Sequence, residues 1–304
     1  MRTNPNLQLF GSAPIFLTLA TFGWATNAVA SQLAIDEVSP MMLIFFRWGL
    51  LVCLIFLLAR REMLAAWPKI RARLIWVFLM GGCGLSFFNA LFYQAAHTTS
   101  AINIGLMQGT MPGFIVLGSL IFFGVQVNKL KVFGLFLSFL GVVIIVSQGS
   151  LENLLSFSFN SGDILMLVAC VFYSGFALGL KNRPDLSDLV MMGYFSLAAF
   201  LTSIPLFAFE SFTSKFLIPT TAGWQIIVYV ALIPSFISQI LFMRGVQLIG
   251  PSSAGLYTNL VPIFAALLAI SILDEILSLY HLIAIVLVFA GIAIFEYKKD
   301  TRTT

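Results

Sequence analysis

Charge is what this sequence has least of. Only 9% of its 304 residues are charged, whereas 60% are hydrophobic, and the mean hydropathy is +1.02. Soluble domains carry about 25% charged residues, so most of the surface of this protein does not face water. The composition excludes a soluble globular protein and predicts a polytopic helical membrane protein.

Cysteine and histidine are also scarce, with three Cys and two His in the chain. Cys53, Cys83 and Cys170 all lie in apolar runs without CxxC spacing, and we interpret them as small packing residues. No metal-ligand spacing, cluster of acids or nucleophile with a neighbouring base is present. We therefore expect no metal, no cofactor and no catalytic residue, and we do not expect an enzyme.

Long apolar runs make up most of the chain. The first of them, Ala13 to Ala34, is too long for a typical signal peptide and is interpreted as a membrane span. Ten spans can be drawn near the roughly 20 residues that cross a bilayer. They cover about 13–34, 39–59, 73–95, 100–124, 130–149, 162–180, 189–209, 223–247, 252–272 and 277–296.

Positive charge is unevenly distributed among the connections between these spans. With the N-terminus placed inside, most of the 16 Lys and Arg fall on the inner side, and the outer connections hold mainly acidic residues. This bias predicts that both chain ends are cytoplasmic and that the protein lies in the cell inner (plasma) membrane. It also accounts for the net charge of +4 without a nucleic-acid partner.

The second half of the chain repeats the first half at a shift of 150 residues. Leu91, Pro112 and Gly141 coincide at this shift with Leu241, Pro262 and Gly291. Each half holds five spans, and an odd number of crossings reverses the orientation of the second half. The sequence therefore predicts two inverted five-helix repeats, over 10–150 and 160–297, which is typical of alternating-access transporters with a substrate site between the repeats.

Arg47 is the most conspicuous polar residue within a span. It lies about eight residues from the outer end of its helix, roughly 12 Å deep, where a lone charge is costly. Two roles are open for it. Arg47 could be structural, bonded to backbone carbonyls or extended outward, or it could face a cavity and a substrate anion. No acidic residue occupies this depth in any span core, which favours a carbonyl or substrate partner over a buried ion pair.

Neutral polar and aromatic residues accompany Arg47. Asn89 and Gln239 coincide under the 150-residue shift, so two amides could reach one ligand from both repeats. Each such residue could instead hold helices together, commonly for about 1 kcal/mol or less. Together they predict a lining that suits an amino acid or another small polar metabolite. The candidate substrate-binding residues are Trp24, Asn27, Arg47, Asn89, Tyr93, Gln108, Tyr173, Gln239, Tyr257 and Asn259.

Nearly the whole chain resembles the EamA type of the drug/metabolite transporter (DMT) superfamily. The resemblance rests on Trp24, FFRWGLL around Arg47 and the run from LFYQAAHTTSAINIGLMQGTMPGF to FGLFLSFLGVVIIV, then on MRGVQLIGPSSAGLYTNLVPIFAALLAISILDE and LIAIVLVFAGIAIF. It implies two EamA domains, and a central cavity lined by spans one to four and six to nine. It also implies export, less often uptake, of amino acids and related metabolites.

Other functions stay open at this point. The protein could export drugs or other organic solutes, although span one lacks the acidic residue that the family's small multidrug members use. It could also be a non-transporting membrane scaffold, which would leave Arg47 and the amides without a purpose. The expected partners are a small-molecule substrate and the lipid bilayer, and the expected state is a monomer or homodimer.

Overall fold

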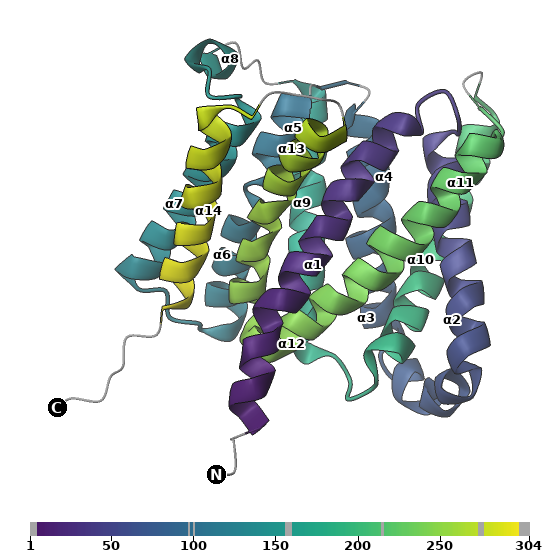
Figure 1. Cartoon of the computed structure of the whole chain (residues 1–304). Coiled ribbons are helices and arrows are strands. Elements are labelled where there is room, and N and C mark those ends of the chain that lie inside the picture. The colour runs from purple at the N-terminus through teal and green to yellow at the C-terminus, as the bar shows by residue number, and fades with distance from the viewer. Residues whose placement is uncertain are drawn as a thin grey trace.

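The computed structural model shows a bundle of helices (Figure 1). It describes residues 5–96, 98–99, 101–155, 160–213, 216–272 and 277–297, and every regular element within these ranges is helical. The first repeat holds α1 (Pro5–Leu33), α2 (Pro40–Arg71), α3 (Leu74–Phe78), η1 (Leu79–Phe87), α4 (Phe88–Ala96), α5 (Ala101–Gln108), α6 (Met111–Phe123) and α7 (Lys129–Val146). After the short α8 (Leu151–Leu155), the second repeat holds α9 (Ser161–Gly179), η2 (Leu180–Asn182), α10 (Asp188–Ser211), α11 (Thr221–Val230), η3 (Ala231–Ile237), α12 (Ser238–Leu256), η4 (Tyr257–Asn259), α13 (Leu260–Ile272) and α14 (Leu279–Glu296).

The described residues contain nine helical stretches that are long and apolar enough to cross a membrane. One of them, Thr221–Leu268, has 48 residues, and a straight helix of that length would measure about 72 Å, more than twice the bilayer core. It is broken at Gly250, where φ is 80°, and α12 descends to this point before α13 rises from it (Figure 1). Because this stretch crosses twice, the protein has the predicted all-α fold of ten spans.

The two ends of the helical bundle define two faces. The start of α1 and the end of α14 lie on the same face of the bundle, at the bottom of Figure 1. We call this the proximal face and the opposite one the distal face. The charged terminal residues that supported a cytoplasmic location of both chain ends fall outside the described ranges.

Packing between the two repeats occurs in matched pairs, as inverted repeats require. In the first repeat α1 packs on α12 and α13, and in the second α9 packs on α4 and α6. The helices α2 and α10 pack on each other, as do α7 and α14. Residues related by the 150-residue shift therefore have equivalent neighbours, and the space enclosed by these helices lies on the pseudo-twofold axis between the repeats.

The second span is longer than the predicted 39–59. The helix α2 continues to Arg71, with non-helical dihedral angles only at Ala59. The extension persists because it is amphipathic: Met63, Ala66 and Ile70 are buried at helical spacing, whereas Arg60 and Arg61 are exposed. A stretch rich in Arg and Lys that suggested a loop is therefore a helix along the proximal end of the bundle.

The third and eighth spans both contain a π-helical segment at equivalent positions. The segment η1 lies between α3 and α4, η3 lies between α11 and α12, and residues 81–87 correspond to 231–237 at the 150-residue shift. Wide turns of this kind release backbone carbonyls from the regular helical ladder and often occur at functional sites. Both segments contact helices of the opposite repeat, η1 with α9 and α10, and η3 with α1 and α2.

Candidate functional site

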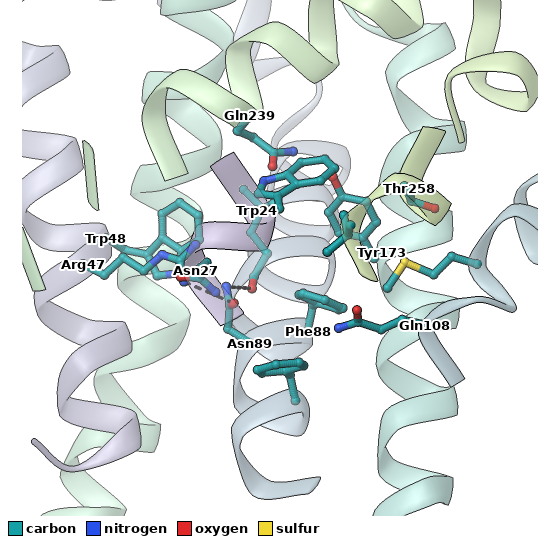
Figure 2. Close-up of a pocket in the computed structure, with 14 residues that line it drawn as sticks. Trp24, Asn27, Arg47, Trp48, Phe88, Asn89, Gln108, Tyr173, Gln239 and Thr258 are labelled. Atoms are coloured by element: carbon teal, nitrogen blue, oxygen red, sulfur yellow. Dashed lines mark hydrogen bonds between the residues drawn. The ribbon is translucent and has the colours of Figure 1, made fainter. Parts of the chain in front are cut away.

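A central cavity lies between the two repeats (Figure 2). Its total empty volume is about 790 Å³, of which about 100 Å³ accepts the centre of a water molecule. Since one water needs roughly 10–15 Å³ by the latter measure, the cavity has room for several waters or a small solute. Its lining consists of Trp24, Asn27, Arg47, Trp48, Leu85, Phe88, Asn89, Phe92, Gln108, Met111, Tyr173, Gln239, Thr258 and Val261.

Arg47 connects the two repeats at the wall of this cavity. It is 5% exposed, its Nε donates a hydrogen bond to Ser235 Oγ, and its Nη1 lies 3.4 Å from Asn89 Oδ1. The guanidinium carbon lies 5.3 Å from the centroid of the Trp48 ring, a cation–π contact. Arg47 therefore joins α2 to α4 of its own repeat and to η3 of the other.

The two oxygens that accept from Arg47 are oriented by the π-helical turns. Ser235 Oγ donates to the Val230 carbonyl at 2.6 Å, and Asn89 Nδ2 donates to the Leu85 carbonyl at 2.7 Å. Each donation fixes the side chain so that its acceptor oxygen faces the guanidinium. The bonds to Val230 and Leu85 thus explain why serine and asparagine suit these two positions.

No carboxylate balances the charge of Arg47 in the part of the chain that the structure describes. The ion pair found there, Arg183–Asp188, lies elsewhere. Neutral dipoles and an aromatic face are the partners of Arg47, although a buried charge is normally paired. The cavity consequently presents an uncompensated positive charge to whatever enters it.

Aromatic rings form the wall opposite Arg47. The Trp24 ring lies 5.6 Å from Tyr173 and 5.0 Å from Phe242, and Phe88 lies 5.2 Å from Tyr173. Trp24 Nε1 donates to the Pro234 carbonyl at 3.1 Å, which anchors α1 to η3. These rings come from both repeats, so they offer an apolar surface in the middle of the cavity (Figure 2).

Several polar atoms at the cavity have no hydrogen-bond partner among the described residues. They are Asn27 Oδ1, Trp48 Nε1, Tyr173 Oη and Gln239 Nε2. Buried polar atoms of folded proteins are almost always bonded to protein, water or ligand. One acceptor, two donors and one phenol hydroxyl, together with Arg47, are therefore available to a polar solute or to water.

The structure brings most of the predicted site residues together. Trp24, Asn27, Arg47, Asn89, Gln108, Tyr173 and Gln239 all line the cavity. The amides of Asn89 and Gln239 reach it from equivalent positions in the two repeats, on α4 and α12 (Figure 2). Their roles in binding a substrate stay predictions.

Tyr93, Tyr257 and Asn259 do not belong to the lining. Tyr93 is buried on α4 and lies near Arg47. Tyr257 donates to Glu296 of α14 at 3.2 Å, and Asn259 donates to Ser138 of α7 at 2.9 Å. The last two residues attach η4 to the peripheral helices.

Sequence reasoning missed several lining residues, most of them apolar. Trp48, Phe88, Phe92 and Met111 border the cavity, and their types alone do not distinguish them from core residues. Trp48 carried one usable signal, because it follows Arg47 directly and indole rings are preferred partners of guanidinium groups.

The EamA-like transporter family pattern matches residues 11–147 and 160–297. An uncharacterized transporter of Bacillus subtilis, YyaM, is 25% identical over 291 residues, covering 91% of this chain and 92% of the relative. The uncharacterized inner membrane transporter YedA of Escherichia coli K12 is 25% identical over 303 residues, covering 97% and 92%.

Two further similarities are more distant. The pseudopaline exporter CntI of Pseudomonas aeruginosa is 24% identical over 243 residues, covering 79% of this chain and 80% of that protein. A solved crystal structure superposes with a TM-score of 0.76 at 20% identity, covering 94% of this chain and 96% of that one. At that identity the superposition shows the fold alone.

Proposed function

Because this chain belongs to the EamA-like transporter family and is a multi-pass membrane transporter, we propose that it moves amino acids or related small polar metabolites by alternating access. The proposed route runs through the central cavity, and the proposed direction is export. The observation that carries this proposal is the charge of Arg47, which faces the cavity without a carboxylate partner among the described residues.

The chemistry of the lining supports a solute with a carboxylate. Arg47 offers a cation, and Trp48 Nε1 offers a further donor beside it. Asn27 Oδ1 offers an acceptor near the same end of the cavity, which suits an ammonium group (Figure 2). The rings of Trp24 and Tyr173 would contact the remaining, less polar part of the solute.

The arrangement of the repeats supports alternating access. The cavity lies on the pseudo-twofold axis, and helix breaks occur in both repeats beside it, at η1 and η3. We assign the proximal face to the cytoplasm of a cell inner membrane, because the positive charge gathers on the connections of that face.

Flux through proteoliposomes tests the proposal. Purified protein would be reconstituted and loaded with radiolabelled amino acids, and efflux would be compared with empty vesicles and with nucleosides and organic cations as alternative solutes. We expect an amino acid to move, and Arg47→Gln to lower its flux at least tenfold. Arg244→Gln is the matched control, since Arg244 lies outside the cavity lining and bonds Gln247. Transport of organic cations without any amino acid would favour the drug-exporter alternative, and no flux of any solute would contradict the carrier.

A further inference from the structure

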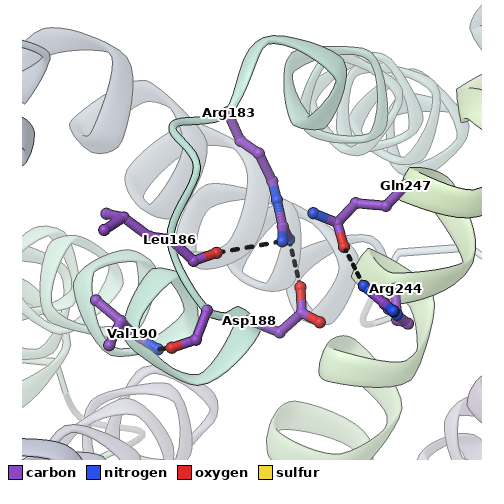
Figure 3. A network of polar contacts seen from close by, with 7 residues as sticks. Arg183, Leu186, Asp188, Val190, Arg244 and Gln247 are labelled. Atoms are coloured by element: carbon purple, nitrogen blue, oxygen red, sulfur yellow. Dashed lines mark hydrogen bonds and ion pairs between the residues drawn. The ribbon is translucent and has the colours of Figure 1, made fainter. Parts of the chain in front are cut away.

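A second hollow lies at the proximal face, separate from the central cavity. It has a total empty volume of about 1110 Å³ and is bordered by three segments. Val125 lies between α6 and α7, and Lys131 lies in the first turn of α7. Lys181 comes from η2 and Arg183 from the residue after it. Gln247 and Ser253 come from the two sides of the break in α12. We call this space the proximal cleft. Figure 3 shows Arg183 and Gln247 facing each other from two of these segments.

The proximal cleft is positively charged. Lys131, Lys181 and Arg183 border it, and Asp185 is the carboxylate among its described lining residues. The Lys181 Nζ lies 4.0 Å from the Phe123 ring centroid, and the Lys131 Nζ lies 5.6 Å from that of Phe295. Neither lysine forms an ion pair with a described carboxylate. Aromatic faces thus hold both ammonium groups in place without neutralising them.

Arg183 adds an unsatisfied donor to the proximal cleft. Its side chain is 6% exposed, and its Nη1 pairs with Asp188 at 2.5 Å. Its Nη2 bonds the Leu186 carbonyl at 3.4 Å, whereas its Nε is buried without a described partner (Figure 3). A buried donor of this kind indicates an acceptor that the protein itself does not supply.

Two helical segments border both the proximal cleft and the central cavity. Along the chain after Gly250, Ser253 borders the cleft and Thr258 borders the cavity, so about 8 Å of helix separates them. Similarly, Leu180 borders the cleft and Tyr173 borders the cavity. The two spaces are therefore aligned along one path.

Close contacts of α6 with α12 and with α9 lie between the two spaces along the chain. A methyl group on Gly255 would lie 2.6 Å from Ile115 Cδ1, and one on Gly118 would collide with Leu178. Ile115 is fully buried, and Leu178 is 8% exposed. The two glycines let α6 approach its neighbours closely at this level, and we call Ile115 and Leu178 together the seal.

We propose that the proximal cleft is the entry vestibule of the transport path, where the carboxylate of the solute binds before the seal of Ile115 and Leu178 opens. The two lysines would attract the anion, and the Arg183 Nε would donate to it. This inference rests on the proposed function, because a vestibule requires a transported solute. It adds a second site for the same anionic group, distinct from Arg47.

Thiol labelling tests the charge of the vestibule without requiring transport. Ser253→Cys would be labelled in detergent with two methanethiosulfonates of similar size, one bearing a sulfonate and one a quaternary ammonium, with the unsubstituted protein as the blank. We expect the sulfonate reagent to react faster than the ammonium reagent. Adding Lys131→Gln and Lys181→Gln should lower the ratio of the sulfonate rate to the ammonium rate about tenfold at low ionic strength. Lys129→Gln is the control, because Lys129 is exposed outside the cleft. A ratio that the double substitution leaves unchanged would overturn the proposal.

Flux then distinguishes a solute vestibule from other anion sites. In proteoliposomes the double lysine variant should have a raised KM for L-glutamate at the proximal face. This rise should be at least fivefold larger than the rise in KM for L-glutamine, and the maximal rate should not change. Labelling in phosphatidylglycerol and in phosphatidylcholine vesicles is the second arm: lysine-dependent protection of the cysteine by phosphatidylglycerol would assign the cleft to a lipid phosphate and refute the vestibule. A labelling bias without flux of any solute would refute the proposed function while leaving the charge of the cleft established.

Discussion

Gly134 and Gly291 bring α7 and α14 into backbone contact. A Cβ on Gly134 would lie 2.7 Å from the Gly291 carbonyl oxygen, and a Cβ on Gly291 would lie 2.6 Å from that of Gly134. The residue pair related to them by the 150-residue shift, Gly141 and Ala284, is also in close contact. The interface is therefore built twice from the same kind of contact, as expected for two similar surfaces related by a twofold axis.

Gly291→Val should destabilise the protein through this interface. The side chain would meet the Gly134 carbonyl and the Ser138 backbone, neither of which has room to move within a packed helix. Overpacking of this kind costs about 1–3 kcal/mol, which thermal unfolding in detergent would register as a lower Tm. Gly113→Ala is the control, since nothing lies within 4 Å of its future Cβ. An unchanged Tm in Gly291→Val would contradict the close packing of α7 and α14.

Glu210 connects the repeats at the distal face. Its carboxylate accepts hydrogen bonds from the backbone N–H groups of Met41 and Met42 at 3.0–3.1 Å, and so caps the start of α2 from the end of α10. Beside it, Ser39 bonds the Leu217 backbone and Thr220 bonds Glu37. The distal ends of α2 and α10 are thus joined by charge-assisted and neutral bonds.

Glu210→Ala should weaken this junction. Loss of a capping side chain costs about 0.5–2 kcal/mol, and the positive end of the α2 dipole would also lose its negative partner. We expect a lower Tm and faster hydrogen exchange at Met41 and Met42, measured by mass spectrometry of the purified protein. Glu152→Ala, on the exposed and peripheral α8, should change neither quantity. Equal exchange in both variants would mean that the cap does not hold α2.

Asn89 and Gln239 should matter for solute binding, whereas Tyr257 should not. Each of the two amides lines the cavity, so Asn89→Ala and Gln239→Ala should lower solute affinity about five- to tenfold with folding retained. Tyr257→Phe removes a bond to Glu296 outside the cavity and should leave KM unchanged. Flux kinetics and size-exclusion profiles of the variants separate the two effects, and a raised KM in Tyr257→Phe alone would reverse the assignment.

The contrast between these residues shows how far the sequence leads. Hydropathy and the 150-residue shift predict the spans and the matched amides, because these depend on periodicity and on repetition. The rotation of η4 does not follow from periodicity. Successive residues of a 3₁₀ helix point about 120° apart, so Thr258 faces the cavity while Tyr257 and Asn259 face α14 and α7.

The π-helical turns could not be predicted from the sequence either. The run around Gly81, Gly82 and Gly84 indicates close packing, and Pro234 indicates a helix defect, but neither specifies a wide turn. These turns orient Asn89 and Ser235 toward Arg47. The predicted depth of Arg47 was therefore not enough to identify its partners, because they depend on helix geometry in two repeats at once.

Ile115 and Gly255 provide the most direct test of how the path is closed. Gly255→Ala would place a methyl group 2.6 Å from Ile115 Cδ1, so it should hold the seal in a strained position and slow transport. Ile115→Ala should have the opposite effect, because it removes the bulky side chain that packs on Gly255 across the α6–α12 junction, and reconstituted protein should leak small solutes. In the double variant, the methyl group added at position 255 fills part of the space that the Ile115 side chain leaves. Its leak should therefore fall below that of Ile115→Ala. Gly113→Ala on the same helix as Ile115 controls for helix propensity, and additive effects of the two substitutions would mean that these residues do not act on each other.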